Sequence, residues 1–228
     1  MKNINEKLLE AVRLNEIEEV RKLIKEGADL NVVDEYGATA LHEASFWGRS
    51  EIVKMLIEAG ADLNVVDVGG RTALHRASFW GYSDVVKMLI EKGADVNVVD
   101  KNGRTALHKA SFSGYSEIVK MLIEKGADLN VVDENGVTVL HWASYKGHSE
   151  IVKILIEKGA DLNVVERLGR TALHVASYKG HSEIVKMLIE AGANVNVVDG
   201  WGDTALHRAS FWGYSDVVKM LEKAGAKQ

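Results

Sequence analysis

DKNGRTALHKASFSGYSEIVKMLIEKGADLNVV, residues 100–132, decides the fold of this chain, because the same pattern returns along almost its whole length. The copies follow one another at a constant spacing of 33 residues and begin at Asp34, Asp67, Asp100, Asp133, Glu166 and Asp199. A fixed period of this length, without insertions, is typical of a repeat array in which each unit buries its apolar face against its neighbours.

The pattern inside one copy predicts a turn, two helices and a connecting loop. Asp100 and Gly103 have the spacing and chemistry of a tight turn. Thr105 is expected to cap a first helix that ends at Gly114, and Ser116 is expected to cap a second helix. The second helix has apolar residues at helical spacing, namely Ile118, Val119, Met121, Leu122 and Ile123. Such a unit can bury its apolar stripe only by stacking on another copy.

Two segments of each copy resemble the ankyrin repeat family: TALH at residues 105–108 and GADLN at residues 126–130. The resemblance covers essentially the whole chain and implies an all-α solenoid of helix-turn-helix units joined by β-turn loops. The family's proline after the threonine is replaced by Ala at positions 40, 73, 106, 172 and 205 and by Val at 139. Because proline only helps to fix the start of a helix, its loss is expected to leave the topology unchanged.

One ankyrin solenoid is expected to span residues 1–228. It divides into an N-terminal cap at 1–33, internal repeats at 34–66, 67–99, 100–132, 133–165 and 166–198, and a C-terminal cap at 199–228. The copies are more alike than natural ankyrin repeats usually are, since residues 78–86 and 210–218 both read SFWGYSDVV. This uniformity resembles a designed ankyrin repeat protein, although recent gene duplication in a natural protein would leave the same trace.

The composition is that of an ordinary soluble globular protein, with 46% hydrophobic and 27% charged residues in 228. No stretch approaches the roughly 20 apolar residues of a membrane span, and the N-terminus lacks the apolar core of a signal peptide. The absence of cysteine excludes disulfides, thiolate nucleophiles and thiolate metal sites. The compartment stays open, with the cytoplasm as the default expectation and recombinant production if the chain is designed.

Seven positions vary most between copies when each copy is numbered from its Asp or Glu as repeat position 1. Positions 2, 3 and 5 fall on the turn, positions 10, 13 and 14 on the first helix, and position 16 just after it. In the ankyrin family the turn tips and first helices line the concave face. The resemblance therefore implies that these seven positions form one binding surface.

The aromatic residues are confined to the same seven positions. All fifteen lie there: Tyr36, Phe46, Trp47, Phe79, Trp80, Tyr82, Phe112, Tyr115, Trp142, Tyr145, Tyr178, Trp201, Phe211, Trp212 and Tyr214. Position 13 is aromatic in all six copies, which fits either a scaffold role or a binding role. Position 14 alternates between Trp47, Trp80 and Trp212 and the polar Ser113, Lys146 and Lys179. Such alternation favours a surface that recognises a partner, for which Trp and Tyr are the usual anchors.

The charges divide in the same way. The seven positions hold eleven bases (Arg49, Arg71, Arg76, Lys101, Arg104, Lys109, Lys146, Arg167, Arg170, Lys179 and Arg208) and four acids (Glu35, Glu43, Glu134 and Asp203). The seven positions therefore carry a net charge of +7, whereas the whole chain carries −5. A basic, aromatic surface on an acidic body favours a partner with an acidic or mixed surface.

The sequence therefore predicts a non-catalytic scaffold that binds a protein target, without a cofactor, metal, small-molecule substrate or membrane. The expected anchors are Trp47, Trp80, Tyr82, Trp142, Trp201, Trp212 and Tyr214. The bases expected to orient the partner are Arg71, Arg76, Arg104, Arg167 and Arg170. The remaining candidates are Tyr36, Phe46, Phe79, Lys109, Phe112, Tyr115, Tyr145, Tyr178, Arg208 and Phe211.

Three other functions are weighed against this prediction. The first is an idealised array without a foreign target, whose aromatic strip buries itself in a homodimer. The second is single-stranded nucleic acid, which also binds to bases interleaved with aromatics, but the low isoelectric point and the lack of a nucleic-acid motif count against it. The third is catalysis or metal binding, because each repeat contains a histidine, but these look like the family's structural histidine. His148 and His181 form only a weak metal-pair signal.

Overall fold

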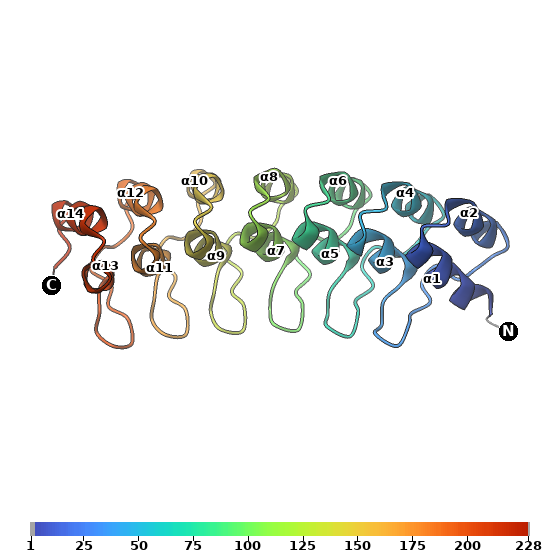
Figure 1. The fold of residues 1–228 in the computed structure, drawn as a ribbon, viewed down its shortest axis with the longest axis horizontal. Coiled ribbons are helices and arrows are strands. Elements are labelled where there is room, and N and C mark those ends of the chain that lie inside the picture. The colour runs from blue at the N-terminus through green and yellow to red at the C-terminus, as the bar shows by residue number, and fades with distance from the viewer. Residues whose placement is uncertain (1–2, 228) are drawn as a thin grey trace. The chain divides into compact units, whose positions relative to one another are not determined.

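The computed structural model describes residues 3–227, and this part of the chain contains fourteen α-helices and no β-strand. The helices are α1 (Ile4–Leu14), α2 (Ile17–Lys25), α3 (Ala40–Phe46), α4 (Ser50–Glu58), α5 (Ala73–Trp80), α6 (Ser83–Glu91), α7 (Ala106–Ser113), α8 (Ser116–Glu124), α9 (Val139–Lys146), α10 (Ser149–Glu157), α11 (Ala172–Lys179), α12 (Ser182–Glu190), α13 (Ala205–Phe211) and α14 (Ser215–Lys223). They form seven helix-turn-helix pairs, each followed by a loop where another pair comes next (Figure 1). The predicted all-α repeat fold is confirmed. No described helix has the length and apolar content that crossing a membrane requires.

The chain divides into two compact units. The first contains the residues up to Ser113 together with Met121–Ala127, and the second contains Gly114–Lys120 together with the residues from Asp128 onward. One uninterrupted solenoid over residues 1–228 therefore stays a prediction.

Within each unit the helices form two layers, and the long loops extend from the layer of first helices (Figure 1). In the first unit α1, α3, α5 and α7 pack against one another in order, as do α9, α11 and α13 in the second. Leu74 of α5 and Leu89 of α6 are completely buried between the layers. Ala77 and Ser78 are also fully buried, and their small side chains allow neighbouring first helices to approach closely.

Each first helix from α3 onward begins after a threonine that exchanges hydrogen bonds with a histidine three residues later. The Thr72 hydroxyl accepts from the backbone N–H of His75, and the Thr72 N–H donates to Nδ1 of the same histidine. Thr105 and His108 form the same pair of bonds, so the prediction that Thr105 caps its helix is confirmed. The histidine takes the role that Glu or Gln has in an ordinary capping box.

The second helices begin differently from the prediction. Helix α8 contains Ser116 as its first residue, so the expectation that Ser116 is the N-cap is wrong by one position. In the equivalent helices α6 and α10 the N-cap is the preceding residue, Tyr82 or His148, whose side chain caps nothing. The reason is the tightness of the reversal, because the N–H of Ser116 already bonds to the carbonyl of Gly114 at 3.1 Å. The connection leaves no extended residue in front of the helix from which a hydroxyl could cap it.

The turn at the start of each repeat is closed by its acidic residue, and within each unit neighbouring turns pack against one another. One carboxylate oxygen of Asp67 accepts from the N–H groups of Gly69 and Arg71, at 2.8 and 3.0 Å. The carbonyl of Gly69 in turn accepts from the N–H of Lys101 in the following turn at 2.9 Å. Gly70 has φ +74°, and a Cβ atom there would lie 2.8 Å from the Lys101 nitrogen. Both the backbone conformation and the neighbouring turn therefore require glycine.

The substitutions Gly70→Ala and Gly202→Ala separate these two requirements. Gly202 occupies the same repeat position with φ +82°, but a Cβ atom there would have no neighbour within 4 Å. Both variants are expected to lose the roughly 1 kcal/mol that a left-handed alanine costs. Gly70→Ala is expected to lose a further 1–3 kcal/mol, on the order of an overpacking penalty, because the adjoining turn must move. Urea unfolding of the two variants measures the difference, and equal losses would contradict the close approach of the turns.

One buried hydroxyl recurs in the first helices of five repeats. The Oγ atoms of Ser45, Ser78, Ser111, Ser144 and Ser177 are buried and have no hydrogen-bond partner among the described residues. A buried hydroxyl without a partner loses its hydration and gains nothing in return. The small size of these side chains thus favours close packing of the helices, whereas their buried hydroxyl groups lower the stability.

Replacing Ser78 by Ala is therefore expected to stabilise the protein. The free energy of unfolding should rise by about 1 kcal/mol, because the desolvated hydroxyl disappears and alanine is the better helix former. The exposed Ser215, the first residue of α14, serves as the control, and Ser215→Ala should change little. A lower melting temperature for Ser78→Ala would mean that the hydroxyl forms a bond in solution.

Candidate functional site

The side chains predicted to bind a partner lie on the turns, on the first helices, or between a first helix and the second helix that follows it. We call the side chains at repeat positions 2, 3, 5, 10, 13, 14 and 16 the variable face. Apart from position 16, the residues of the variable face belong to the layer of first helices and to the long loops that extend from it, which Figure 1 shows within each unit. Exposure differs widely within it, from Phe211 at 81% and Trp201 at 63% to the largely covered Arg76.

In the first unit the rings at positions 13 and 14 form one cluster. Phe46 contacts Trp47 and Trp80 edge-on, with ring centroids 4.9 and 5.4 Å apart. Phe79 contacts Trp80 edge-on at 5.2 Å and stacks on Phe112 at 6.5 Å. Trp47 remains 54% exposed in spite of these contacts. The cluster therefore joins repeats to one another and also presents aromatic surface to solvent.

In the second unit some of the aromatic surface is covered by lysine. The Lys179 ammonium lies 4.3 Å from the ring centroid of Tyr145 and 5.4 Å from that of Tyr178. Trp142 is half-buried and contacts Tyr145 edge-on at 6.3 Å. Trp212 contacts Tyr178 at 5.5 Å. The aromatic surface of this unit is most open at Trp201 and Phe211.

Position 16 contributes to packing between repeats more than the sequence suggests. Tyr82 lies over Gly48 of the preceding repeat, where a Cβ atom would come within 2.5 Å of its ring, and Tyr214 covers Gly180 in the same way. His148 and His181 cover Gly114 and Gly147. The rings at position 16 thus fill the space that a glycine leaves, which accounts for their partial burial.

Of the two roles that the sequence left open for position 13, the structure shows the scaffold role, and the binding role stays a prediction. Its rings contact the position-14 ring of the following repeat, as Phe46 does with Trp80 and Tyr178 does with Trp212. Phe79 and Tyr145 nevertheless keep substantial exposed area. Tyr36 of the first turn is exposed, and so is Tyr115 of the second unit.

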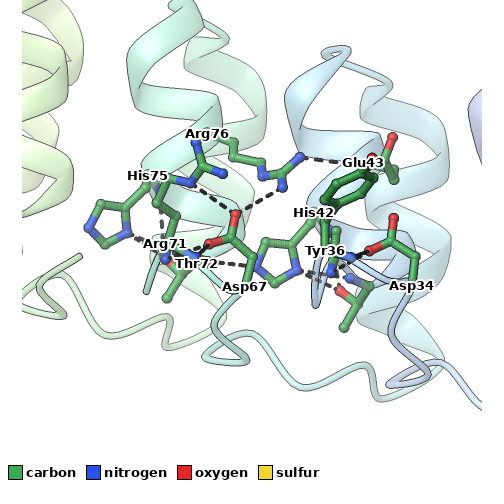
Figure 2. Close-up of polar contacts among 12 residues, drawn as sticks. Asp34, Tyr36, His42, Glu43, Asp67, Arg71, Thr72, His75 and Arg76 are labelled. Atoms are coloured by element: carbon green, nitrogen blue, oxygen red, sulfur yellow. Dashed lines mark hydrogen bonds and ion pairs between the residues drawn. The ribbon is translucent and has the colours of Figure 1, made fainter. Parts of the chain in front are cut away.

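Several of the predicted orienting bases are paired with acids at repeat position 1. Figure 2 shows Arg71 and Arg76 meeting at one carboxylate oxygen of Asp67, each at 2.9 Å. Arg76 also lies 3.6 Å from Glu43 and is only 12% exposed, whereas Arg71 is 47% exposed. Burial opposes ionisation of Asp67, yet hydrogen bonds from the Arg71 N–H and the Arg76 guanidinium hold the pKa of this carboxyl below its ordinary value.

The same pairing recurs in other repeats. Lys109 binds Asp100 at 2.6 Å, Arg170 binds Glu166 at 2.8 Å, and Arg208 binds Asp199. When the six acids at position 1 are counted, the basic surplus of the variable face falls from +7 to +1. The sequence analysis missed this role, although an acid at position 1 of every copy was the available signal. Arg167 is exposed, and Arg104 is half-buried with its N–H donating to Asp100.

The histidine at position 9 of each repeat has a structural role, as His75 shows. Nε2 of His75 bonds to the carbonyl of Arg104 in the next repeat at 2.9 Å, and Nδ1 accepts from the Thr72 N–H. A carbonyl can only accept and a backbone N–H can only donate, so the ring is neutral with its proton on Nε2. Burial lowers the pKa of this histidine, as it does for His42, His141 and His174.

The described residues contain no group of three His, Cys, Asp or Glu side chains that could hold a metal ion. Ser78 and its equivalents are buried and have no adjacent base, which a serine nucleophile needs.

A family model for ankyrin repeats, described as three copies, matches residues 8–100, 94–166 and 161–228. The chain belongs to the ankyrin repeat family, and the fold is an ankyrin solenoid. A comparison with curated proteins finds no significant match. Ankyrin repeats are generally protein-interaction modules and typically have no enzymatic activity.

The buried histidines predict that stability falls as the pH is lowered from 7.5 towards 5. The folded state holds His42, His75, His141 and His174 below their ordinary pKa, so the unfolded chain binds more protons in this range. A second loss of stability follows below about pH 4, where ordinary carboxyl groups titrate. The folded state also lowers the pKa values of the carboxyl groups of Asp67, Asp100, Glu166 and Asp199. The unfolded chain therefore binds more protons in this range as well. Urea unfolding at a series of pH values measures both.

His75→Gln is the control, because glutamine can replace the capping bond without titrating. It should reduce the pH dependence between 7.5 and 5 and leave the dependence below 4 unchanged. A variant with the full dependence would show that other groups cause it.

Proposed function

We propose that this chain is a non-catalytic scaffold that binds a protein partner through its variable face. The observation that supports this most strongly is the presence of open tryptophans on the first helices and turns, with Trp47 at 54% and Trp201 at 63% exposure. Burying such large amphipathic rings is how protein interfaces obtain most of their binding energy.

The choice of residues at position 14 supports recognition over packing. The structure accommodates Trp47, Trp80 and Trp212 at this position, and it also accommodates Lys146 and Lys179 there. A position that accepts either residue within one fold is not dictated by that fold. We therefore take Trp47, Trp80, Trp201 and Trp212 as the principal anchors.

The ion pairs modify the expected partner. Because Arg76, Lys109, Arg170 and Arg208 are paired with acids of the chain itself, the proposal favours a partner of mixed charge over a strongly acidic one. The exposed Arg71 and Arg167 remain the bases best placed to meet acidic groups of a partner. The near identity of the repeats supports a designed or recently duplicated array.

Self-association is the second candidate, and one observation favours it. Phe211 is 81% exposed and lies beside the half-exposed Trp212, which gives α13 an open apolar end. Light scattering after size exclusion, over a range of concentrations, distinguishes the two functions. A scaffold for a foreign partner keeps a mass near 25 kDa, whereas a homodimer doubles that mass as the concentration rises.

The variant Trp47→Lys/Trp80→Lys tests the proposed function, because it gives the first unit the residue that Lys146 and Lys179 already supply in the second. The wild-type chain is used to capture partners from a protein mixture, and the affinity of each captured protein is then measured by calorimetry. Losing two anchors should weaken binding by about 2 kcal/mol or more, roughly 30-fold. Thermal unfolding should change much less, because the tryptophans are largely exposed.

Ala59→Lys/Ala191→Lys is the matched control. It adds the same charge and is also copied from the chain, which has Lys92, Lys125 and Lys158 at that repeat position, on the exposed side of the second helices. The control should bind like the wild type. If both double variants lost affinity equally, charge would be responsible and the variable face would not be the binding surface.

A further inference from the structure

A hollow of about 340 Å³ opens in the first unit among α3, α5 and α7. Its lining joins the rings of Phe46, Phe79 and Trp80 to the basic side chains of Arg71, Arg76 and Lys109. This volume lies at the lower end of the range of ligand pockets in proteins. The hollow lies within the variable face, so any inference about it rests on the proposed function.

The acceptors around the hollow are already engaged. Both carboxylate oxygens of Asp67 accept hydrogen bonds, one from two backbone N–H groups and the other from Arg71 and Arg76. Asp100 accepts from two backbone N–H groups and from Lys109. The two oxygens of Glu43 meet Arg13 and Arg76. His75 has both ring nitrogens bonded.

The hydrogen-bond donors around the hollow, in contrast, are only partly used. Arg71 gives only its Nε to Asp67, so its two terminal nitrogens have no acceptor among the described residues. Nε of Arg76 is buried without a partner, and Lys109 forms one bond with an ammonium that can donate three. The Asp67 side chain is fully covered while that of Arg71 is 47% exposed, so an incoming group meets the cations first. The hollow therefore favours a group that accepts hydrogen bonds and carries negative charge.

The aromatic rings of the hollow indicate what kind of chemical group lies next to the negatively charged acceptor. Phe46 and Trp80 stand edge-on at 5.4 Å, and Phe79 continues the wall, which leaves apolar surface beside the donors. A carboxylate on its own would leave the rings exposed to water. A carboxylate next to an apolar side chain would let that side chain cover the rings.

The second unit has a related hollow with a different lining. It measures about 180 Å³, and Val175 stands at the repeat position of Arg76. Lys179 replaces Trp80 and lies over the rings of Tyr145 and Tyr178. The second hollow also has an open tryptophan, Trp201, and the Arg170 side chain likewise gives only its Nε to Glu166. The first hollow is set apart by its volume, which is about twice as large, and by the wall of Phe46, Phe79 and Trp80.

We infer that the hollow of the first unit receives a carboxylate of the protein partner, from an Asp or Glu side chain or a chain terminus, whose apolar neighbour lies against Phe46, Phe79 and Trp80. Arg71 donates to the carboxylate, and Lys109 approaches it from α7. The hollow thereby fixes the register of the partner on an otherwise largely aromatic surface.

Three small probes with the same ring test this inference on the full chain: 3-phenylpropionate, its neutral amide and 3-phenylpropylamine. The amide and indole N–H signals of the isotope-labelled protein are followed during titration. 3-Phenylpropionate should shift the Trp80 indole signal saturably and bind at least about tenfold more tightly than the amide, as charge-assisted bonds do. The amine should bind more weakly still.

Arg71→Gln should weaken 3-phenylpropionate at least about fivefold, because it removes the most exposed donor. The fold is retained, since Asp67 keeps its bond to Arg76. Arg170→Gln makes the same change at the same repeat position of the second unit, and it should leave the titration at Trp80 unchanged.

Equal binding of the three probes, or shifts that avoid Trp80, would overturn the inference. A short oligothymidylate that occupies the hollow more tightly than 3-phenylpropionate would overturn it in favour of nucleic acid. If the probes fail while Trp47→Lys/Trp80→Lys still abolishes partner capture, only the role of the hollow is lost and the proposed function stands.

Discussion

The neutral histidine at repeat position 9 is the contact on which the array depends. Its Nδ1 takes up the N–H of the capping threonine, and its Nε2–H reaches a carbonyl of the next repeat, as in His42, which bonds to Arg71 at 2.8 Å. One ring thus fixes the start of a helix and the position of the following turn together. The carboxylate of that turn then holds the bases of the variable face. The order of the variable face therefore follows from a contact that is itself buried.

Much of the fold could be read from one copy, because its signals are local. The turn glycine, the capping threonine and the apolar stripe lie within a few residues of one another, and the period extends them along the chain. The expectation that failed, Ser116 as a cap, also used a local rule, but the reversal after Gly114 is tighter than that rule assumes. The helix boundary moved by one residue and the topology did not change.

The candidate site was less predictable, because its decisive contacts join different repeats or different parts of one repeat. Tyr82 varies between copies like a binding residue, yet its ring fills the space above Gly48, which lies 34 positions earlier. Arg76 looks like a free base in sequence, but its partner Asp67 is nine residues away and was assigned only to the turn. Variation between copies does not by itself separate side chains that face solvent from those that face a neighbour.

The turns have a consequence for how such a protein can change. At the tip, the backbone N–H groups are held by the carboxylate and the glycine is enclosed by the adjoining turn, as at Asp67 and Gly70. The two residues between them, Val68-Gly69 here and Gly200-Trp201 in the last repeat, contribute no side chain to that bonding. The tip is thus a rigid frame around two replaceable residues. An ankyrin array built in this way can change the residues that its tips present, by selection or by design, without changing the hydrogen bonds that shape the tips.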